Sequence, residues 1–356
     1  MRPPPSRPEP RVDVALMSGY HSPQLDVKIR LNTNESPVPP PDGWRQAVAD
    51  ETATIPWHRY PDRAAGELRA ALARHHGTSP DMVFAANGSN EVLQSLCLAY
   101  AGAGRSVAVF EPTYTLHSHI ARLTGAAVAA GERRDDFTLD VDEVRRVVTT
   151  DRPAITLLCS PNNPTGMVEP EAVVRALLAD APGLLVVDEA YGQFAPWTAV
   201  DLVDDDVPLV VTRTYSKTWA TAGLRLGYCV APTWVVDQLD KVALPYHLDA
   251  FKQVAGRLAL DYEAEMRARV AGLVEERGRV YACLTELDVD VWPSAANFIL
   301  FRPRHRSSDD VWAALVDRSI LIRNCSSWPR LDGCLRVSIG TPDENDAFLT
   351  ALTEIL

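Results

Sequence analysis

Between residues 107 and 214, four short apolar runs alternate with stretches of mixed polarity. The runs are VAVFEP (107–112), AITLLCS (154–160), LLVVDEA (184–190) and PLVVTRT (208–214), and residues 171–178 have the pattern of an amphipathic helix. Strands that are apolar on both faces and joined by helices are typical of a parallel sheet buried beneath helices on each side. The alternation therefore predicts an α/β fold, with a large domain whose mostly parallel sheet is covered by helices.

The pattern changes near residue 250. Residues 250–282 are predicted to form one long helix of apolar and charged positions, which suits a helix that connects two bodies. Shorter strand patterns follow, in NFILFR (297–302), ILIR (320–323) and CLRVSIG (334–340). The N-terminal segment is too short to fold alone and is expected to pack with this part. We therefore expect a large domain over residues 46–245 and a smaller α+β domain over residues 1–45 and 246–356.

Every predicted strand of the large domain leads into a polar cluster. These clusters are NGSN (87–90), EPTY (111–114), PNNPTG (161–166), DEAY (188–191) and TRTYSK (212–217). Taken singly, each has an ordinary structural explanation, such as a turn, a helix cap or a lysine that extends to the surface. Because the carboxyl ends of parallel strands share one edge of a sheet, where ligands of open α/β sheets bind, we expect the clusters to converge on one small molecule.

The first cluster also predicts an anion site. A helix is expected to begin directly after Gly88 and Ser89, because apolar residues follow the helical period from residue 93 to residue 100. The free backbone N–H groups at a helix N-terminus bind anions. Ser216 and Arg225 can add a hydroxyl and a guanidinium group, and together these groups suit one phosphate.

Composition narrows the functional classes. The chain has 356 residues with 35 basic and 47 acidic side chains, a net charge of −12, which argues against general binding of nucleic acid or of anionic membranes. No apolar run approaches the length of a membrane span, and the first ten residues lack the apolar region of a secretion signal. The six cysteines are scattered without a C-x-x-C motif, which favours reduced thiols in the cytoplasm and no metal site.

The clusters as a set resemble the fold-type-I aminotransferases that depend on pyridoxal 5′-phosphate (PLP), and most closely the histidinol-phosphate aminotransferase family. The resemblance covers nearly the whole chain. Its most specific part is VVDEAY followed, 29 residues after its aspartate, by the lysine of an S-K-x₇-R pattern. The motifs that carry it are LNTNESP (31–37), RYPD (59–62), NGSNE (87–91), PTY (112–114), SPNNPTG (160–166), VVDEAY (186–191), SKTWATAGLRLGY (216–228), ANF (296–298) and LRVSIGTPDEN (335–345).

The resemblance implies a role for each cofactor-binding residue. Lys217 would bond covalently to the aldehyde carbon of PLP and later move a proton between substrate and cofactor. Asp188 would pair with the pyridine nitrogen, Tyr191 and Asn163 would hydrogen-bond the phenolic oxygen O3′, and Tyr114 would stack on the ring unless it is a core tyrosine. The residues implied for the cofactor phosphate are Gly88, Ser89, Asn90, Ser216 and Arg225.

The resemblance also implies a substrate pocket that two subunits share. Tyr60 would reach the phosphate of the partner subunit's cofactor, so the active form would be a homodimer. Arg336 would bind the substrate anion, unless it is a surface arginine, and Arg323 would be a second arginine of the pocket. Tyr20 would cover the active site or serve only in packing, and Asn163 would also touch the substrate. His117 and His119 follow the PTY motif, and a solvated helix face is preferred for them over contact with substrate.

The substrate is left open between several activities. The leading expectation is amino transfer between histidinol phosphate and 2-oxoglutarate in histidine biosynthesis. One alternative is an aminotransferase for aromatic amino acids, because the same scaffold can accept a ring with or without a phosphate. A less favoured one is a PLP decarboxylase of a phosphorylated amino acid. A PLP sensor fused to a DNA-binding domain would need a longer N-terminal extension.

Overall fold

The computed structural model of the chain describes residues 8–15, 17, 19 and 23–356. Its larger sheet has the strand order β2-β8-β7-β6-β5-β3-β4, and the strands from β3 to β7 pair in parallel. Strand β8 runs antiparallel to both of its neighbours, so the expected mostly parallel sheet is confirmed. The strands are β2 (Val83–Ala86), β3 (Ser106–Glu111), β4 (Ala127–Glu132), β5 (Ile155–Cys159), β6 (Leu184–Asp188), β7 (Leu209–Thr214) and β8 (Gly227–Val230).

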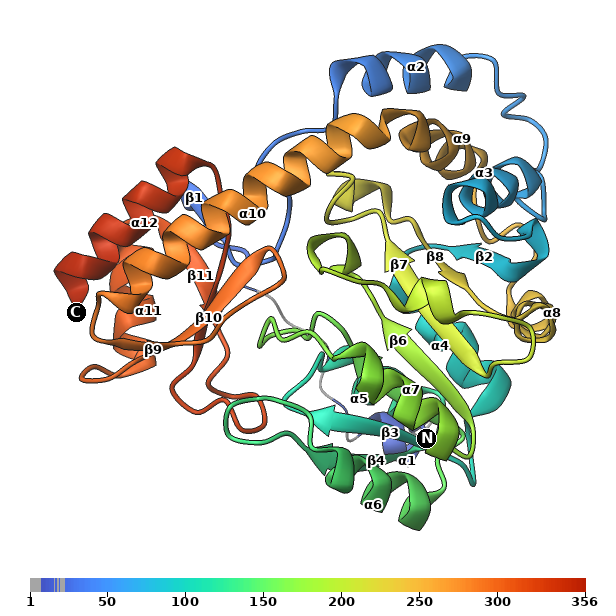
Figure 1. Cartoon of the computed structure of the whole chain (residues 1–356). Coiled ribbons are helices and arrows are strands. Elements are labelled where there is room, and N and C mark those ends of the chain that lie inside the picture. Colours follow the sequence, from blue (N-terminus) through green and yellow to red (C-terminus); the bar gives the residue numbers. More distant parts are fainter. Residues whose placement is uncertain (1–7, 16, 18, 20–22) are drawn as a thin grey trace, which may run out of the picture.

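Helices cover both faces of this sheet (Figure 1), which explains why its central strands are mostly apolar. Val186 and Val187 are consecutive on β6, yet they belong to separate hydrophobic cores on opposite faces. Helices α4, α5 and α8 supply one core, and α3, α6 and α7 contribute to the other. The helices are α3 (Gly66–His76), α4 (Ser89–Tyr100), α5 (Leu116–Leu123), α6 (Val141–Asp151), α7 (Glu171–Asp180) and α8 (Thr233–Val242).

The smaller sheet has the order β1-β11-β12-β10-β9, and all its pairs are antiparallel except β1 with β11. Strand β1 therefore brings the N-terminal segment to the C-terminal part of the chain. Helices α11 and α12 pack together beside this sheet. The elements are β1 (Ile29–Leu31), β9 (Val289–Val291), β10 (Phe298–Pro303), α11 (Ser308–Asp317), β11 (Ile320–Asn324), β12 (Leu335–Ser338) and α12 (Pro342–Ile355). The domain bounds at residues 45/46 and 245/246 stay a prediction.

The expected single helix over 250–282 is divided in two. Helix α9 (Ala250–Ala259) ends in a 3₁₀ turn at Leu260–Tyr262, and α10 (Glu263–Thr285) continues beyond it. The break lets α9 lie against α2 (Asp42–Thr52) and α3, while α10 extends to contact β9, β10 and α12. Helix α10 thus spans from one sheet to the other (Figure 1).

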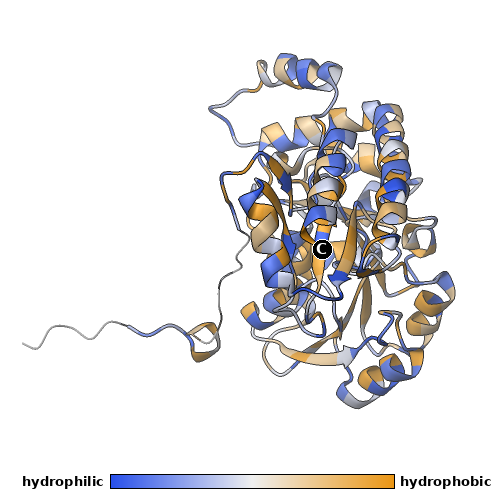
Figure 2. Cartoon of the chain, turned by 90° about the vertical axis from the view of Figure 1, so that its left-hand side faces the viewer, coloured by the Kyte–Doolittle hydropathy of each residue, from blue (hydrophilic) through white to orange (hydrophobic). Residues whose placement is uncertain are grey.

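Apolar residues concentrate in the strands and on the inner faces of the helices, whereas the outer helical faces carry charged residues (Figure 2). Before β1, the short helix α1 (Val12–Ala15) contacts α5. In the part of the chain that the structure describes, no helix combines the length and the apolar character of a membrane span. The remaining 3₁₀ turns are η1 (Pro80–Met82), η2 (Gly192–Phe194), η3 (Ala199–Leu202) and η4 (Ala222–Leu224).

Candidate active site

A cavity of about 400 Å³ lies where the carboxyl ends of the large sheet meet the smaller sheet and the loop after β1. All five polar clusters contribute residues to its wall, as the strand-end argument predicts. The volume lies within the range of small-molecule sites in proteins. Of the residues predicted from the sequence, those lining the cavity are Ser89, Asn90, Tyr114, Asn163, Asp188, Tyr191, Ser216, Lys217, Arg225 and Arg336.

Three predicted residues of the described part of the chain are not in the cavity wall. Gly88 lies directly behind it, next to Arg225. Tyr60 is 80 % exposed and stacks on Tyr246, with the ring centroids 4.4 Å apart. Arg323 is buried on β11, where its guanidinium lies 5.3 Å from the ring of Trp328, a residue that does line the cavity. Tyr20 lies outside the described residues.

At the predicted anion site, the N-terminus of α4 lies close to the guanidinium group of Arg225. Gly88 has a φ of +88°, a conformation that favours glycine, and a Cβ atom there would come within 2.9 Å of Nη2 of Arg225. A Cβ atom on Gly227 would come within 2.2 Å of the backbone nitrogen of Ser89. Arg225 also donates to the Ser216 hydroxyl at 3.2 Å. The two glycines therefore let a helix N-terminus, a guanidinium and a hydroxyl line one side of the cavity, which suits a phosphate.

Lys217 lies in the same cavity and is half-buried. Its Nζ donates to the backbone carbonyl of Thr33 at 2.9 Å. Burial lowers the pKa of this amine to about 7, and the positive charges of Arg336 and Arg225 act in the same direction against the opposing effect of Glu35. A large fraction of Lys217 is therefore uncharged near neutral pH, and an uncharged amine is the nucleophilic form.

Asp188 ends β6 and is only 1 % exposed. Its Oδ1 accepts from the Thr212 hydroxyl at 3.1 Å and from the backbone N–H of Ala190 at 3.2 Å. Its Oδ2 accepts from Nε2 of His117 at 3.0 Å. These donors hold the carboxylate in one orientation at the cavity wall, where it can pair with a cationic ring nitrogen.

The expectation that His117 lies on a solvated helix face was wrong. His117 is fully buried and lies edge-on to the Tyr114 ring, whereas His119 is half-exposed. Residues three and four positions apart share one face of a helix, so His117 lies on the same buried side of α5 as Ile120 and Ala121. Residue 119 points to a different side. This apolar period was the sequence signal that could have identified His117.

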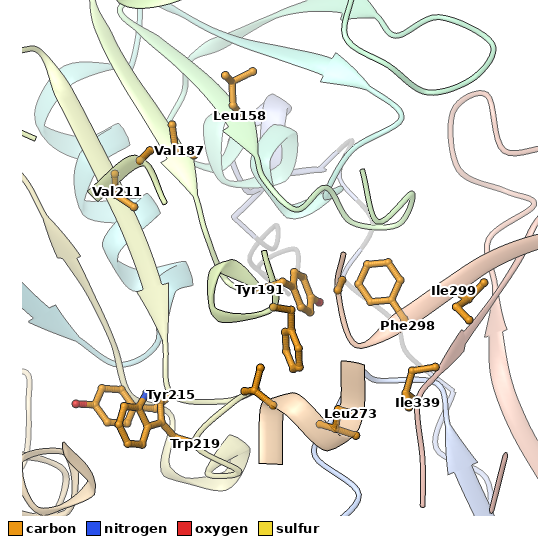
Figure 3. Close-up of a cluster of buried hydrophobic side chains, with 14 of the residues drawn as sticks. Leu158, Val187, Tyr191, Val211, Tyr215, Trp219, Leu273, Phe298, Ile299 and Ile339 are labelled. Carbon is orange, nitrogen blue, oxygen red and sulfur yellow. The ribbon is translucent and has the colours of Figure 1, made fainter. Parts of the chain in front are cut away.

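Tyr191 and Asn163 lie beside residues of the smaller sheet. Arg336 of β12 donates to Oδ1 of Asn163 and to the backbone carbonyl of Asn32, and its guanidinium lies 5.1 Å from the Phe298 ring centroid. Figure 3 shows Tyr191 next to Phe298, and the two rings meet edge-on with centroids 5.1 Å apart. Arg336 is therefore a buried residue of the cavity wall and not a surface arginine.

The loop after β1 contributes residues whose roles the sequence did not indicate. Besides the Thr33 carbonyl, Asn34 donates from Nδ2 to the Tyr191 hydroxyl at 2.9 Å. Both residues belong to the LNTNESP motif (31–37), which supports the family resemblance but predicts no role for either residue. Their importance depends on contacts with segments more than 150 residues away in the chain, and no local pattern reports such contacts.

The polar and aromatic groups of the cavity wall fit the chemical groups of PLP. An anion site, a buried carboxylate, an aromatic ring and an amine of lowered pKa share one cavity, and these match the phosphate, ring nitrogen, ring face and aldehyde of the cofactor. Two further buried polar atoms of the wall, Nε of Arg336 and Oδ1 of Asn32, have no hydrogen-bond partner among the described residues. Within the same part of the chain, no three His, Cys, Asp or Glu side chains are grouped as metal ligands.

Comparisons with known proteins agree with this site. Residues 26–352 match the family model of class I and II aminotransferases. A histidinol-phosphate aminotransferase of Corynebacterium diphtheriae is 41 % identical over 97 % of this chain and 96 % of its own length. One from Frankia casuarinae is 44 % identical over 96 % of this chain and 88 % of its own. The solved structure of the Sinorhizobium meliloti histidinol-phosphate aminotransferase in complex with PLP is 25 % identical, with a TM-score of 0.84 over 92 % of this chain and 91 % of that one.

Proposed function

Because the chain belongs to the class I and II aminotransferase family, we propose that it transfers the amino group between histidinol phosphate and 2-oxoglutarate with PLP as cofactor. The observation that carries the proposal is the presence of two separate anion-binding groups in one cavity. The α4 N-terminus with Arg225 suits the cofactor phosphate, and Arg336 from the other sheet remains for a substrate anion. A guanidinium can bind either a phosphate or a carboxylate in a bidentate manner, so Arg336 can serve both the phosphorylated substrate and the oxo acid.

Five residues of the cavity wall would take part in this chemistry. When bound, PLP supplies an aldehyde that accepts the amino group and a ring that withdraws electrons. Lys217, whose amine has a lowered pKa, would hold the aldehyde and would carry a proton to or from the substrate carbon. Asp188 would keep a proton on the ring nitrogen, and Tyr191 with Asn163 would hold the phenolic oxygen. Tyr114 would pack on the ring, and the smaller sheet, which contributes Arg336 to the wall, would limit the access of water.

The substrate proposal is tested by comparing amino donors with the purified enzyme and 2-oxoglutarate. We expect kcat/KM to be highest for histidinol phosphate and much lower for phenylalanine, because only the first offers Arg336 a phosphate. Carbon dioxide release from phosphothreonine is measured in parallel and is expected to be negligible. Strong transfer from phenylalanine with none from histidinol phosphate would instead establish an aromatic aminotransferase, and rapid decarboxylation would establish a decarboxylase.

The lowered pKa of Lys217 predicts the pH dependence of cofactor capture. PLP-free enzyme should bind PLP faster as the pH rises through about 7 and the rate should then level off, because the amine is protonated below its pKa of about 7 and uncharged above it. The visible absorbance of the bound cofactor, followed by stopped flow, measures this rate. A rate that still rises towards the ordinary lysine pKa of 10.5 would contradict the prediction.

The proposal includes a homodimer with Tyr60 at the interface. Apolar side chains are exposed on two neighbouring segments, which the stacking of Tyr60 on Tyr246 brings together. Contiguous exposed apolar surface of this kind favours a protein interface. The exposed residues are Trp57, Tyr60, Leu244, Tyr246 and Phe251. A second copy of the chain would cover them and bring Tyr60 of the partner subunit to the cofactor phosphate.

Mixing two impaired variants tests whether each active site contains residues of both subunits. Lys217→Ala and Tyr60→Ala chains are each expected to be impaired alone at limiting PLP, and activity should return when they are unfolded together and refolded. In the mixed dimer, one site then carries both substitutions and the other site carries neither. Activity no greater than the sum of the separately refolded variants would contradict a site built from two subunits.

A reducing compartment, such as the cytoplasm, is also part of the proposal. All six cysteines are free thiols in the structure, and five of them are buried. Burial raises the pKa of Cys97 and of Cys229 to about 12, so these thiols stay protonated and unreactive. Unpaired thiols in this number are typical of proteins that are not exposed to oxidising conditions.

A further inference from the structure

Asn34 connects Tyr191 to the smaller sheet through every polar group that it has. Its backbone N–H donates to the Ser338 hydroxyl at 2.9 Å, and its carbonyl accepts from Nδ2 of Asn297 at 3.1 Å. Its side-chain Oδ1 accepts from the Ser338 hydroxyl at 2.9 Å, and Nδ2 donates to the Tyr191 hydroxyl at 2.9 Å. Asn34 is 1 % exposed and lines the cavity. No freedom remains for its amide group to rotate without loss of a hydrogen bond.

The orientation of this amide follows from the donors and acceptors around it. The Ser338 hydroxyl accepts from the backbone N–H of Asn34 and donates its own proton to Oδ1 of Asn34. In this orientation the NH₂ group of Asn34 faces Tyr191, and every one of these donors has an acceptor. The guanidinium of Arg336 can only donate, so Oδ1 of Asn163 faces Arg336 and Nδ2 of Asn163 faces the Tyr191 hydroxyl at 3.5 Å.

The Tyr191 oxygen is consequently an acceptor towards both amide groups. The hydroxyl has one proton to donate, and neither Asn34 nor Asn163 presents an acceptor to it. The Tyr191 ring is held in place because it is 4 % exposed and packs edge-on against Phe298 (Figure 3). The hydroxyl proton is therefore directed into the cavity, whose wall Tyr191 forms.

We propose that Asn34, locked by Ser338, is a positioning residue that makes the Tyr191 hydroxyl a fixed hydrogen-bond donor towards the phenolic oxygen of bound PLP. The inference rests on the proposed cofactor site. A fixed donor stabilises the deprotonated form of the chromophore, because that form carries more negative charge on the oxygen.

The backbone conformation of Asn34 agrees with this role. Its φ of +56° lies in the left-handed region, where asparagine, aspartate and glycine are the best tolerated residues. Asn34→Asp and Asn34→Gly therefore keep the backbone free of added strain. The aspartate has the shape of asparagine but presents an acceptor to Tyr191, which draws the hydroxyl proton away from the cavity. The glycine removes the side-chain hydrogen bonds of Asn34 to Ser338 and Tyr191 without adding an acceptor.

The experiment measures the pH midpoint of the visible absorbance band of PLP-loaded enzyme, which a purely structural role would not move. Asn34→Asp should raise this midpoint by about one pH unit or more, the order of shift that one hydrogen bond to a charged acceptor produces. Asn34→Gly should raise it less. The same two substitutions are then made in a Tyr191→Phe background, where they should cause a clearly smaller shift because the proton that they redirect is gone.

Two results would overturn the inference. One is an unchanged midpoint in Asn34→Asp, and the other is an equal shift with and without the Tyr191 hydroxyl, since that would be the effect of the new charge alone. Circular dichroism and retained PLP binding show that each variant is folded. If the cofactor site itself were wrongly proposed, the unsubstituted enzyme would show no visible band at any pH. That result is distinct from the two results above.

Discussion

The Lys217→Ala variant should lose amino transfer by several orders of magnitude and should lose the visible absorbance of bound PLP. In the proposed mechanism Lys217 would supply both the amine that bonds the aldehyde and the group that moves the proton, and a methyl group can do neither. No other lysine lines the described cavity. Steady-state kinetics with histidinol phosphate and an absorbance spectrum after PLP addition measure the two effects.

Lys252→Ala is the matched control. Lys252 lies on α9 in an ion pair with Asp249, away from the cavity wall, so its removal should leave the spectrum and kcat unchanged. Thermal unfolding of both variants shows whether the fold is retained. A Lys217→Ala enzyme that keeps the visible band would refute the assignment of this lysine.

The second large effect is expected for Asp188. Asp188→Ala should still bind PLP through the phosphate site but should slow proton removal from the substrate by several orders of magnitude, because the ring nitrogen then lacks its anionic partner. The deuterium isotope effect with substrate labelled at the carbon that bears the amino group should rise as this step becomes rate-limiting. Near-normal turnover in this variant would contradict the role.

Asp188→Asn separates the charge of Asp188 from its packing. The amide keeps the size of the carboxylate and can still accept from Thr212 and from the N–H of Ala190, but it carries no negative charge. We expect a loss of the same order as in Asp188→Ala. If Asp188→Asn instead retained most activity, the effect of alanine would come from the unpaired His117 and Thr212 side chains and not from the lost charge.

The parts of the fold that the sequence predicted are those governed by burial. Strands β5, β6 and β7 are covered on both faces, so all their residues are buried and most of them are apolar, a pattern that one sequence shows. Strand β4 at the edge of the sheet is AVAAGE, which lacks that pattern, and it was not predicted. The convergence of polar clusters followed from parallel topology alone.

The parts that the sequence did not predict depend on contacts between distant segments. The break between α9 and α10 involves neither glycine nor proline, and it follows from packing against α2 and α3. The burial of His117 depends on which side of α5 faces the sheet, and the role of Asn34 depends on Ser338, which lies 304 residues away in the sequence. Such contacts form only when the two sheets come together.

The central claim is that PLP is bound covalently to one particular amine, and mass spectrometry after borohydride reduction tests it most directly. The chain has four lysines, Lys28, Lys217, Lys241 and Lys252, so digestion separates every possible site of attachment. The account predicts that one PLP group per chain is fixed on the peptide that contains Lys217. Reduction that leaves this peptide unmodified, or that places the group on any of the other three lysines, would contradict it.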